Sequence, residues 1–248
     1  MRLRQIALVA QDLSKVRADV AAVLGVDYAY DDPGVGKYGL RNAVFPVGDT
    51  FLEIVSPKTS GTTAGRLLEK RGGDGGYMVI LQVDDLAQAR ARVHDAHARI
   101  VDHRDGDAAF THIHPKDLGG AILSLDFMKP KERWEWGGPN WQSHVRTDTS
   151  LRIAGAELQA VNPKQMAARW AEVLGRGAVE HGLKWRIPLD DGELRFAEEC
   201  DGRGEGLSAF DLVVRSMGAV RTNAAARGLV DRDGTVTLCG TRVRLIEH

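Results

Sequence analysis

The chain has 248 residues, of which 43% are hydrophobic and 27% charged, and its 33 basic and 34 acidic side chains give a net charge of -1. The length favours two domains of common size. The even charge balance argues against nucleic acid or an anionic membrane as a partner. Cys200 and Cys239 form neither a disulfide framework nor a CxxC metal motif, and no apolar run approaches the roughly 20 residues of a membrane-spanning helix. We therefore expect a cytoplasmic protein.

The first sixty or so residues predict the order strand, helix and three strands. Residues 3–9 read as a strand. Asp12 is a suitable N-cap for a helix that carries valine and leucine at helical spacing and ends at Gly25. Short strands follow at 28–30, 40–46 and 50–56, with glycine and aspartate between them.

The same order returns three times, which indicates an internal repeat. The second copy has a strand at 76–83, a helix capped by Asp84 or Asp85, and strands at 99–103, 109–114 and 121–126. The third has a strand at 151–161, a helix from Pro163 to Gly175, and strands at 184–188 and 193–198. The fourth has a strand at 206–214, a helix at 220–227, and strands at 235–238 and 241–246.

Residues 131–149 interrupt this rhythm and are read as a tryptophan-rich linker containing Trp134, Trp136 and Trp141. Because exposed tryptophan is unfavourable, we expect the linker to pack against a domain, another subunit or the rim of a pocket. The predicted domains are residues 1–130, with modules 3–58 and 76–127, and residues 150–248, with modules 150–200 and 206–248.

Four segments resemble the vicinal-oxygen-chelate superfamily, which includes glyoxalases, bleomycin-resistance proteins and dioxygenases. Residues 3–13 and 51–57 resemble the opening and closing strands of one module. Residues 76–86 and 114–125 resemble those of a second, as in methylmalonyl-CoA epimerase-like proteins. The resemblance implies an α+β fold in which tandem βαβββ modules pair into two glyoxalase-like domains, each with a cupped mixed sheet.

The resemblance also implies where a site would lie, because ligands in this family come from the first and last strands of each module. Those positions fall on Gln5, Glu53, Met78 and Ser124. Strand alternation places all four on the face that lines the cup. The same alternation adds further ligand-binding candidates to that face: Phe51, Gln82 and Asp126.

The metal-ligand set is incomplete, because a thioether and a hydroxyl are poor ligands for hard divalent ions. Gln5 and Glu53 remain as candidate ligands. His112 and His114 share one face of a strand and could supply a histidine if that face lines the cup; alternatively, they are hydrogen-bonded groups at a strand end and a turn. Both a divalent metal and a metal-free pocket stay open.

The second domain offers no ligand set at the corresponding positions, which fall near Gly155, near Arg195, and at Phe210 or Asp211. It is therefore interpreted as a structural partner or a degenerate copy.

Three functions remain open for the first domain. Burial of Glu53 would raise its pKa towards that of a useful base, and with His112 or His114 it could act as a lyase or isomerase/epimerase on a small organic molecule. The carboxylate could instead be a structural group tied to Gln5 or Arg41. A metal-free drug- or metabolite-binding protein of the bleomycin-resistance type is the second function, and a structural dimer module without activity is the third. Exposed strand edges and the linker favour a homodimer.

Overall fold

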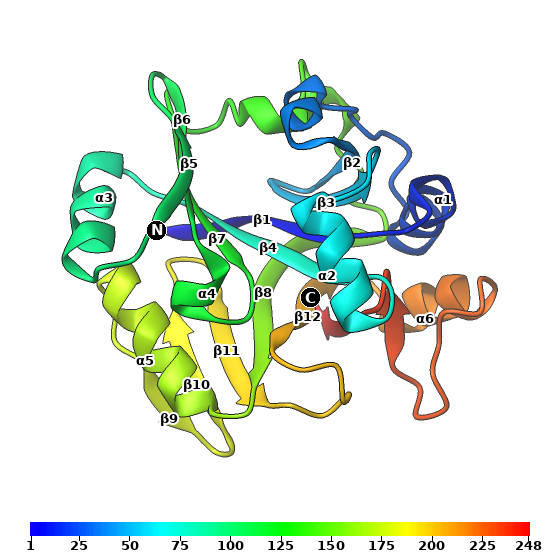
Figure 1. Ribbon diagram of the computed structural model, residues 1–248. Coiled ribbons are helices and arrows are strands. Elements are labelled where there is room, and N and C mark those ends of the chain that lie inside the picture. Colours follow the sequence, from blue (N-terminus) through cyan, green and yellow to red (C-terminus); the bar gives the residue numbers. More distant parts are fainter. The chain divides into compact units, whose positions relative to one another are not determined.

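A computed structural model describes residues 1–248 (Figure 1). The helices are α1 (Leu13–Leu24), α2 (Thr63–Arg71), α3 (Leu86–Asp95), α4 (Pro115–Leu118), α5 (Pro163–Leu174) and α6 (Met217–Ala225), with the 3-10 helices η1 (Pro33–Tyr38), η2 (Glu135–Gly137) and η3 (Trp141–His144). The strands are β1 (Arg2–Val9), β2 (Leu40–Val47), β3 (Thr50–Pro57), β4 (Gly75–Gln82), β5 (Ile100–Arg104), β6 (Ala108–Ile113), β7 (Ile122–Met128), β8 (Ser150–Ala160), β9 (Val179–His181), β10 (Lys184–Pro188), β11 (Glu193–Glu198), β12 (Gly206–Val214), β13 (Val236–Leu238) and β14 (Thr241–Glu247).

The strands form two mixed sheets of seven strands each, which confirms the predicted α+β class. Every module uses the same pairing. Its first strand runs parallel to its last, as in β1 with β3, β4 with β7, β8 with β11 and β12 with β14. The other strands of each module add in antiparallel fashion, as β2 does to β3. The repeat predicted from the sequence is thus a repeat of strand topology.

The chain divides into two compact units, each built from separate segments. Unit 1 contains Met1–Arg4, Met78–Glu135 and Gly155–Ser208, and therefore most of the second and third modules. Unit 2 contains Gln5–Tyr77, Trp136–Ala154 and Ala209–His248, and therefore most of the first and fourth. The domain boundaries expected from the sequence, 1–130 and 150–248, stay a prediction.

Helix ends follow the capping rules on which the sequence prediction relied. The side chain of Asp12 accepts a hydrogen bond from the backbone of Lys15 at 3.0 Å, and Asp85 does the same for Gln88 at 2.8 Å. Such a bond satisfies a backbone N–H that has no partner within the helix. At the other end of α1, Gly25 adopts the left-handed conformation with φ of 69°.

The predicted strand at residues 28–30 is wrong. Tyr30 makes only an isolated bridge to Val44, and the next residues form η1. Asp32 caps this 3-10 helix and Pro33 opens it, which favours a helical turn over a sheet ladder. Helix α2 was not predicted, because its segment is largely polar.

The tryptophan linker packs as expected, and its two halves join different units. In unit 1 the Trp134 ring is fully buried, and the guanidinium carbon of Arg4 lies 5.3 Å from its centroid. In unit 2 Trp141 meets Phe51 edge-on, with ring centroids 4.9 Å apart. The backbone of Gly137 lies against the same phenylalanine ring, so closely that a Cβ there would sit 2.4 Å from it. Burying these rings removes large apolar areas from water.

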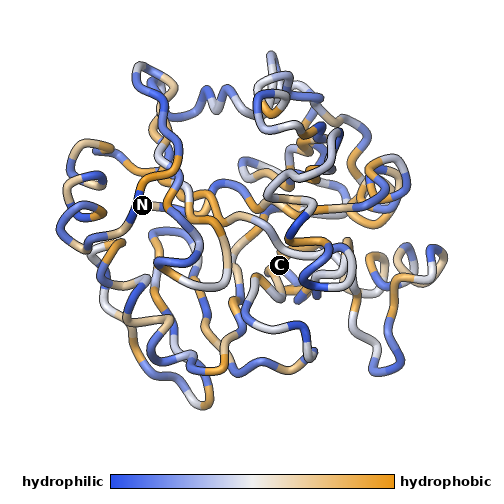
Figure 2. Tube along the Cα trace, viewed as in Figure 1, coloured by the Kyte–Doolittle hydropathy of each residue, from blue (hydrophilic) through white to orange (hydrophobic).

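Hydrophobic stretches of the chain follow many of the strands, while hydrophobic and hydrophilic residues alternate along the helices (Figure 2). On β1, for example, Ile6 and Leu8 are fully buried. No helix has the length and apolar character needed to cross a lipid bilayer. The outer strands β5 and β9 expose Val101 and Val179, each about half accessible, which is the kind of edge on which the predicted homodimer would depend.

Candidate functional site

In unit 2, strands β1 and β3 bring Gln5 and Glu53 to one face of the sheet, as strand alternation predicts. Ala7 pairs with Glu53 and Gln5 pairs with Phe51 along the parallel ladder. Partners in such a ladder point the same way, and residues two apart share a face. The predicted closeness of positions 5 and 53 is therefore confirmed.

The two carboxylate oxygens of Glu53 each accept a hydrogen bond from a side-chain amide. Gln5 Nε2 donates to Oε2 at 2.8 Å, and Asn42 Nδ2 donates to Oε1 at 2.6 Å. Asn42 is itself oriented, because its Oδ1 accepts from the backbone N–H of Asp32 at 2.9 Å. All three side chains of this cluster are buried. The carboxylate is held in one orientation by two flanking strands.

Burial is the largest influence on Glu53 and raises its pKa above the ordinary value of 4.5. The hydrogen bonds from Asn42 and Gln5 favour the ionised form and offset part of that rise. Burial also raises the pKa of Tyr77 to about 12, and the Glu53 carboxylate adds to the shift. Tyr77 therefore keeps its proton at neutral pH, and Glu53 binds its proton more tightly than a solvated glutamate does.

Phe51, a predicted ligand-binding residue, lies on the same face as Glu53 but is fully buried. Trp141 and the backbone of Gly137 cover its ring. Within unit 2, Phe51 thus fixes the linker against the sheet. A direct role in binding stays a prediction.

In unit 1, strands β4 and β7 place four further candidates on one face: Met78, Gln82, Ser124 and Asp126. Met78 pairs with Ile122, Ile80 with Ser124, and Gln82 with Asp126. Ser124 donates a short hydrogen bond to Asp126, and Gln82 donates to the carbonyl oxygen of Lys131 at 2.8 Å. The polar groups of this face are therefore already engaged with protein partners.

His112 joins this face and His114 does not. His112 pairs with Ser124 across the β6–β7 ladder, and its ring stacks on Phe110 with centroids 4.3 Å apart. His114 lies beyond the end of β6, where its Nδ1 accepts from the backbone of Lys116 at 3.1 Å and caps α4. His114 therefore matches the alternative prediction, in which it is a hydrogen-bonded group at a turn.

Sequence reasoning missed Asn42, although a signal was present. Asn42 is a polar residue in a strand whose following residues, Ala43 to Val47, are apolar and buried. It stands two residues from Val44, the direct partner of Glu53 on β3, and so shares the face of Glu53. A buried amide in such a place requires a hydrogen-bond partner, and the nearest titratable group on that face is Glu53.

The donor set does not fit a divalent metal. Both oxygens of Glu53 already accept amide protons, and Gln5 turns its Nε2, a donor, towards that carboxylate. Met78 offers a soft thioether, and the Ser124 hydroxyl is committed to Asp126. No group of three His, Cys, Asp or Glu side chains is arranged to hold a metal ion.

The second sheet carries charged groups at the positions equivalent to this site. In unit 1, Arg195 pairs with Glu157 along the β8–β11 ladder, and Gly155 pairs with Glu193. In unit 2, the fully buried Phe210 and the neighbouring Asp211 lie on opposite faces of β12, and Asp211 approaches Arg244 at 3.7 Å. Of the predicted positions, Arg195 and Asp211 form ion pairs, and together the positions make no metal-ligand set.

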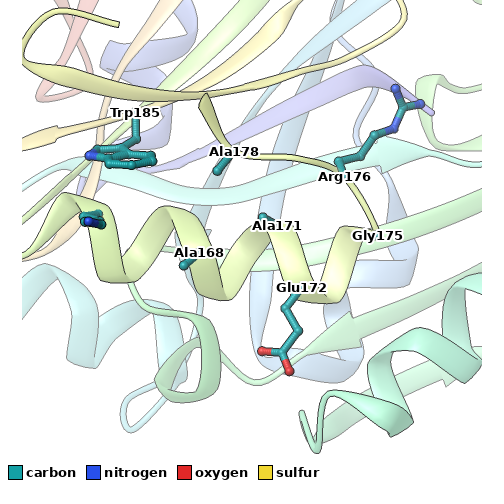
Figure 3. Close-up of a pocket in the computed structure, with 8 residues that line it drawn as sticks. Ala168, Ala171, Glu172, Gly175, Arg176, Ala178 and Trp185 are labelled. Atoms are coloured by element: carbon teal, nitrogen blue, oxygen red, sulfur yellow. The ribbon is translucent and has the colours of Figure 1, made fainter. Parts of the chain in front are cut away.

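An open groove of about 480 Å³ lies between α5 and the face of β10 that carries Trp185 (Figure 3). Ala168, Ala171 and Gly175 form its floor, and Trp185 stands over them. The ammonium of Lys164 lies 5.4 Å from the Trp185 ring centroid. This groove holds none of the candidate residues predicted from the sequence.

Comparison with known proteins places these features in a family. Mitochondrial methylmalonyl-CoA epimerase of Bos taurus is 27% identical over 132 residues, which span 50% of this chain and 73% of that protein. The ethylmalonyl-CoA/methylmalonyl-CoA epimerase of Cereibacter sphaeroides is 25% identical over 132 residues and is covered over 96% of its length. A mutant 4-hydroxymandelate synthase from Streptomyces coelicolor shares the fold, with a TM-score of 0.68, 16% identity, and coverage of 92% of this chain and 75% of that one.

The sequence model of a family described as "Glyoxalase-like domain" matches residues 6–174, which is more than half of the chain. This match covers β3, which carries Glu53, begins on β1 just after Gln5, and continues through α5. The chain has the vicinal-oxygen-chelate fold and belongs to the glyoxalase-like domain family.

Proposed function

We propose that this protein catalyses proton transfer at a carbon next to a carbonyl group, in an isomerase or epimerase reaction on a small organic molecule, with Glu53 as the base. The observation that carries the proposal is the Glu53 carboxylate itself. It is buried, held by two amide donors, and its pKa is raised by burial. A general base works best when its pKa lies near the working pH.

In this proposal, a substrate proton is taken up on a remaining lone pair of Glu53. A carboxylate has about four lone-pair positions, and the two amides occupy one on each oxygen. Gln5 and Asn42 orient the group, which lowers the entropic cost of reaching a reactive arrangement. The similarity to two epimerases of acyl-CoA esters supports this class of chemistry and suggests methylmalonyl-CoA as the first substrate to test.

The test is deuterium exchange at the carbon between the two carbonyl groups of methylmalonyl-CoA. The protein is incubated with that compound in D2O, and deuterium uptake is followed by mass spectrometry. We expect uptake above the rate without enzyme, slowed about 100-fold or more in Glu53→Gln, the range typical of a lost general base. Glu69→Gln on α2 is the matched control, because Glu69 is exposed and belongs to the same unit.

Exchange at the wild-type rate in Glu53→Gln would exclude Glu53 as the base. His112 stays a predicted second proton-transfer group, and His112→Gln in the same assay tests it. His114→Gln serves as its control, because His114 caps α4. Absence of exchange by the wild-type protein would remove methylmalonyl-CoA from the proposal.

Metal-free binding of a small molecule is the second candidate, and the half-buried Ile122, paired with Met78 on one face of β4 and β7, favours it. A binder needs shape and apolar contact more than a base. A ligand that binds the folded state raises the melting temperature as its concentration exceeds its Kd. If the same ligand stabilises wild type and Glu53→Gln equally, and neither exchanges deuterium, the binder replaces the enzyme.

A further inference from the structure

The internal repeat sets an arginine where the first module has Glu53. In the first module, Glu53 on β3 pairs with Ala7 on β1 and with Val44 on β2. In the third module, Arg195 on β11 pairs with Glu157 on β8 and with Arg186 on β10. Because the strand order is the same, Arg195 is the positional equivalent of Glu53, and the charge at that position is inverted.

The side chains around Arg195 form a charged row in unit 1. Arg195 Nε contacts Glu157 at 3.2 Å, and its Nη1 donates to Glu193 at 3.0 Å. Lys184 Nζ contacts the same Glu157 oxygen at 2.6 Å. Arg186 Nη1 reaches Glu193 at 3.4 Å. The row therefore holds three cations and two anions.

The spare positive charge rests on Arg186. It stands directly opposite Arg195, a cross-strand pairing of like charges that costs stability unless an anion compensates. Glu193 contacts both arginines but cannot neutralise both. The Nε of Arg186 is shielded from water and makes no hydrogen bond. An unpaired buried donor is unfavourable and adds to the cost of this pairing.

The two outer cations remain accessible to a ligand. The side chain of Lys184 is 40% exposed and that of Arg186 is 30% exposed, whereas Arg195 is 1% exposed. Nε of Arg186 is buried and Nη1 points to Glu193, so a ligand would meet the guanidinium at Nη2. Nη2 and the ammonium of Lys184, two residues away on the same face of β10, suit the two oxygens of a carboxylate or phosphate group.

We propose that the polar face of β8, β10 and β11 is a second binding site, specific for a small organic anion whose oxyanion group sits on Arg186 and Lys184. Arg195 positions the row from beneath and does not contact the ligand. The third module is thus a charge-inverted copy of the Glu53 site. It binds an anion where the first module is proposed to accept a proton.

Glu157 and Glu193 keep the row ordered without the ligand. Burial alone would raise the pKa of Glu157, but the hydrogen bond and charge of Lys184, together with the charge of Arg195, hold that pKa below its ordinary value. Glu157 therefore remains ionised at neutral pH and keeps both cations in place. Such an arrangement lowers the ordering cost that a ligand would otherwise meet.

The test uses two probes, succinate and inorganic phosphate, added to the ¹⁵N-labelled full-length protein at constant ionic strength, because salt alone would screen exposed charges. The Nε–Hε signals of the arginines are followed by NMR. We expect a saturable shift of the Arg186 signal, identified by its loss in Arg186→Lys. The probe that binds more tightly shows whether a carboxylate or a phosphate group is preferred.

Three variants sharpen the result. Arg186→Gln removes the charge and the guanidinium, and should weaken binding about tenfold or more. Arg186→Lys keeps the charge but loses the planar guanidinium, and should also weaken binding. Arg133→Gln removes an exposed cation of the same unit outside the row, and should leave affinity unchanged.

No saturable shift with either probe would overturn the proposal, and so would equal affinity in Arg186→Gln and Arg133→Gln. If Arg186→Gln does not fold, Arg186→Lys and Lys184→Gln give the same comparison. Glu53→Gln should bind both probes like the wild type, so failure of the proton-transfer proposal leaves this one intact.

Discussion

Glu53 is subject to two opposing influences, and their balance sets its chemistry. Burial disfavours the charged form, while the amides of Gln5 and Asn42 stabilise it. A carboxyl group with burial alone would stay protonated and be a poor base at neutral pH. One with amide donors but no burial would be too weak a base. In this cluster the two amides offset part, but not all, of the rise in the pKa of Glu53 that burial causes.

Removing the shorter of the two amide contacts should shift that balance. In Asn42→Ala the carboxylate loses the 2.6 Å hydrogen bond, so we expect the pKa of Glu53 to rise further. The measurement is a pH titration of the ¹³C carboxyl signal of Glu53. Asn223→Ala on α6 of the same unit is the control and should leave the titration unchanged. An unchanged or lowered pKa in Asn42→Ala would show that Asn42 does not stabilise the anion.

The raised pKa of Glu53 also predicts how stability depends on pH. The folded state binds the Glu53 proton more tightly than the unfolded state does. The stabilisation is therefore complete below the ordinary pKa of 4.5 and is lost as the pH rises through the raised value. Glu53→Gln cannot titrate. The free energy of unfolding of the wild type, minus that of Glu53→Gln, should fall as the pH rises from 4.5.

Urea denaturation at several pH values measures this difference, and Glu69→Gln provides the reference for a solvated glutamate. A difference that grows as the pH rises above 4.5 would mean that the folded state prefers the charged form of Glu53.

Strand alternation predicted the face on which Gln5 and Glu53 meet, because side chains point alternately to the two faces of the sheet along both β1 and β3. It did not find Asn42, whose contact depends on the pairing of β2 with β3 and on the orientation of its amide. It grouped His114 with His112, because alternation cannot tell where a strand ends. The cap on α4 decides that point.

At the scale of elements, long segments with clear apolar periodicity were predicted and short or polar ones were not. Helices α1 and α5 carry both an apolar face and caps at their ends. Helix α2 is short and largely polar, and strand β9 consists of three exposed residues, so neither has a clear apolar pattern in the sequence. The linker is intermediate: its tryptophans predicted packing, but the residues they contact are distant in sequence.

The linker's packing on the sheet leads to a prediction about Gly137. A Cβ at this position would lie 2.4 Å from the Phe51 ring, so Gly137→Ala forces the linker or the ring to move. Overpacking of this kind costs about 1–3 kcal/mol. We expect a lower free energy of unfolding in urea and a change in tryptophan fluorescence, because Trp141 packs on the same ring.

Gly36→Ala is the matched control, since Gly36 is exposed and a Cβ there would meet nothing within 4 Å. If Gly137→Ala were as stable as Gly36→Ala, the close packing of the linker on Phe51 would be wrong.

At the scale of the whole molecule, the sequence predicts four modules grouped in consecutive pairs along the chain, and that grouping stays a prediction. The sequence resemblance links modules that follow each other along the chain. Each compact unit, in contrast, contains segments from both the first and the second half of the chain. In unit 1 the α5 residue Arg169 donates to the carbonyl oxygen of Asp117 on α4 at 2.8 Å. In unit 2, Cys239 Sγ lies 3.2 Å from the carbonyl oxygen of Val9. Residues so far apart in the sequence show no pattern in their neighbouring residues that would predict such a contact.

The clearest such contact joins the first and fourth modules within unit 2. Asp19 on α1 is buried, and its Oδ1 lies 2.6 Å from Arg227 Nη2, just beyond the end of α6. Lys15 pairs with the other oxygen at 2.8 Å, but its own side chain is 63% exposed. Removing Arg227 would leave a buried carboxylate with one solvated partner, which is costly because desolvation is no longer compensated.

Arg227→Gln should therefore lower the free energy of unfolding by about 1–3 kcal/mol, whereas Arg221→Gln, an exposed arginine of α6, should change it by about 0.5 kcal/mol or less. Urea denaturation measures both. Adding Asp19→Asn to Arg227→Gln should recover part of the loss, because a neutral amide is less costly to bury than an unpaired carboxylate. Equal stability of the two arginine variants would mean that the fourth module does not stabilise α1 through this pair.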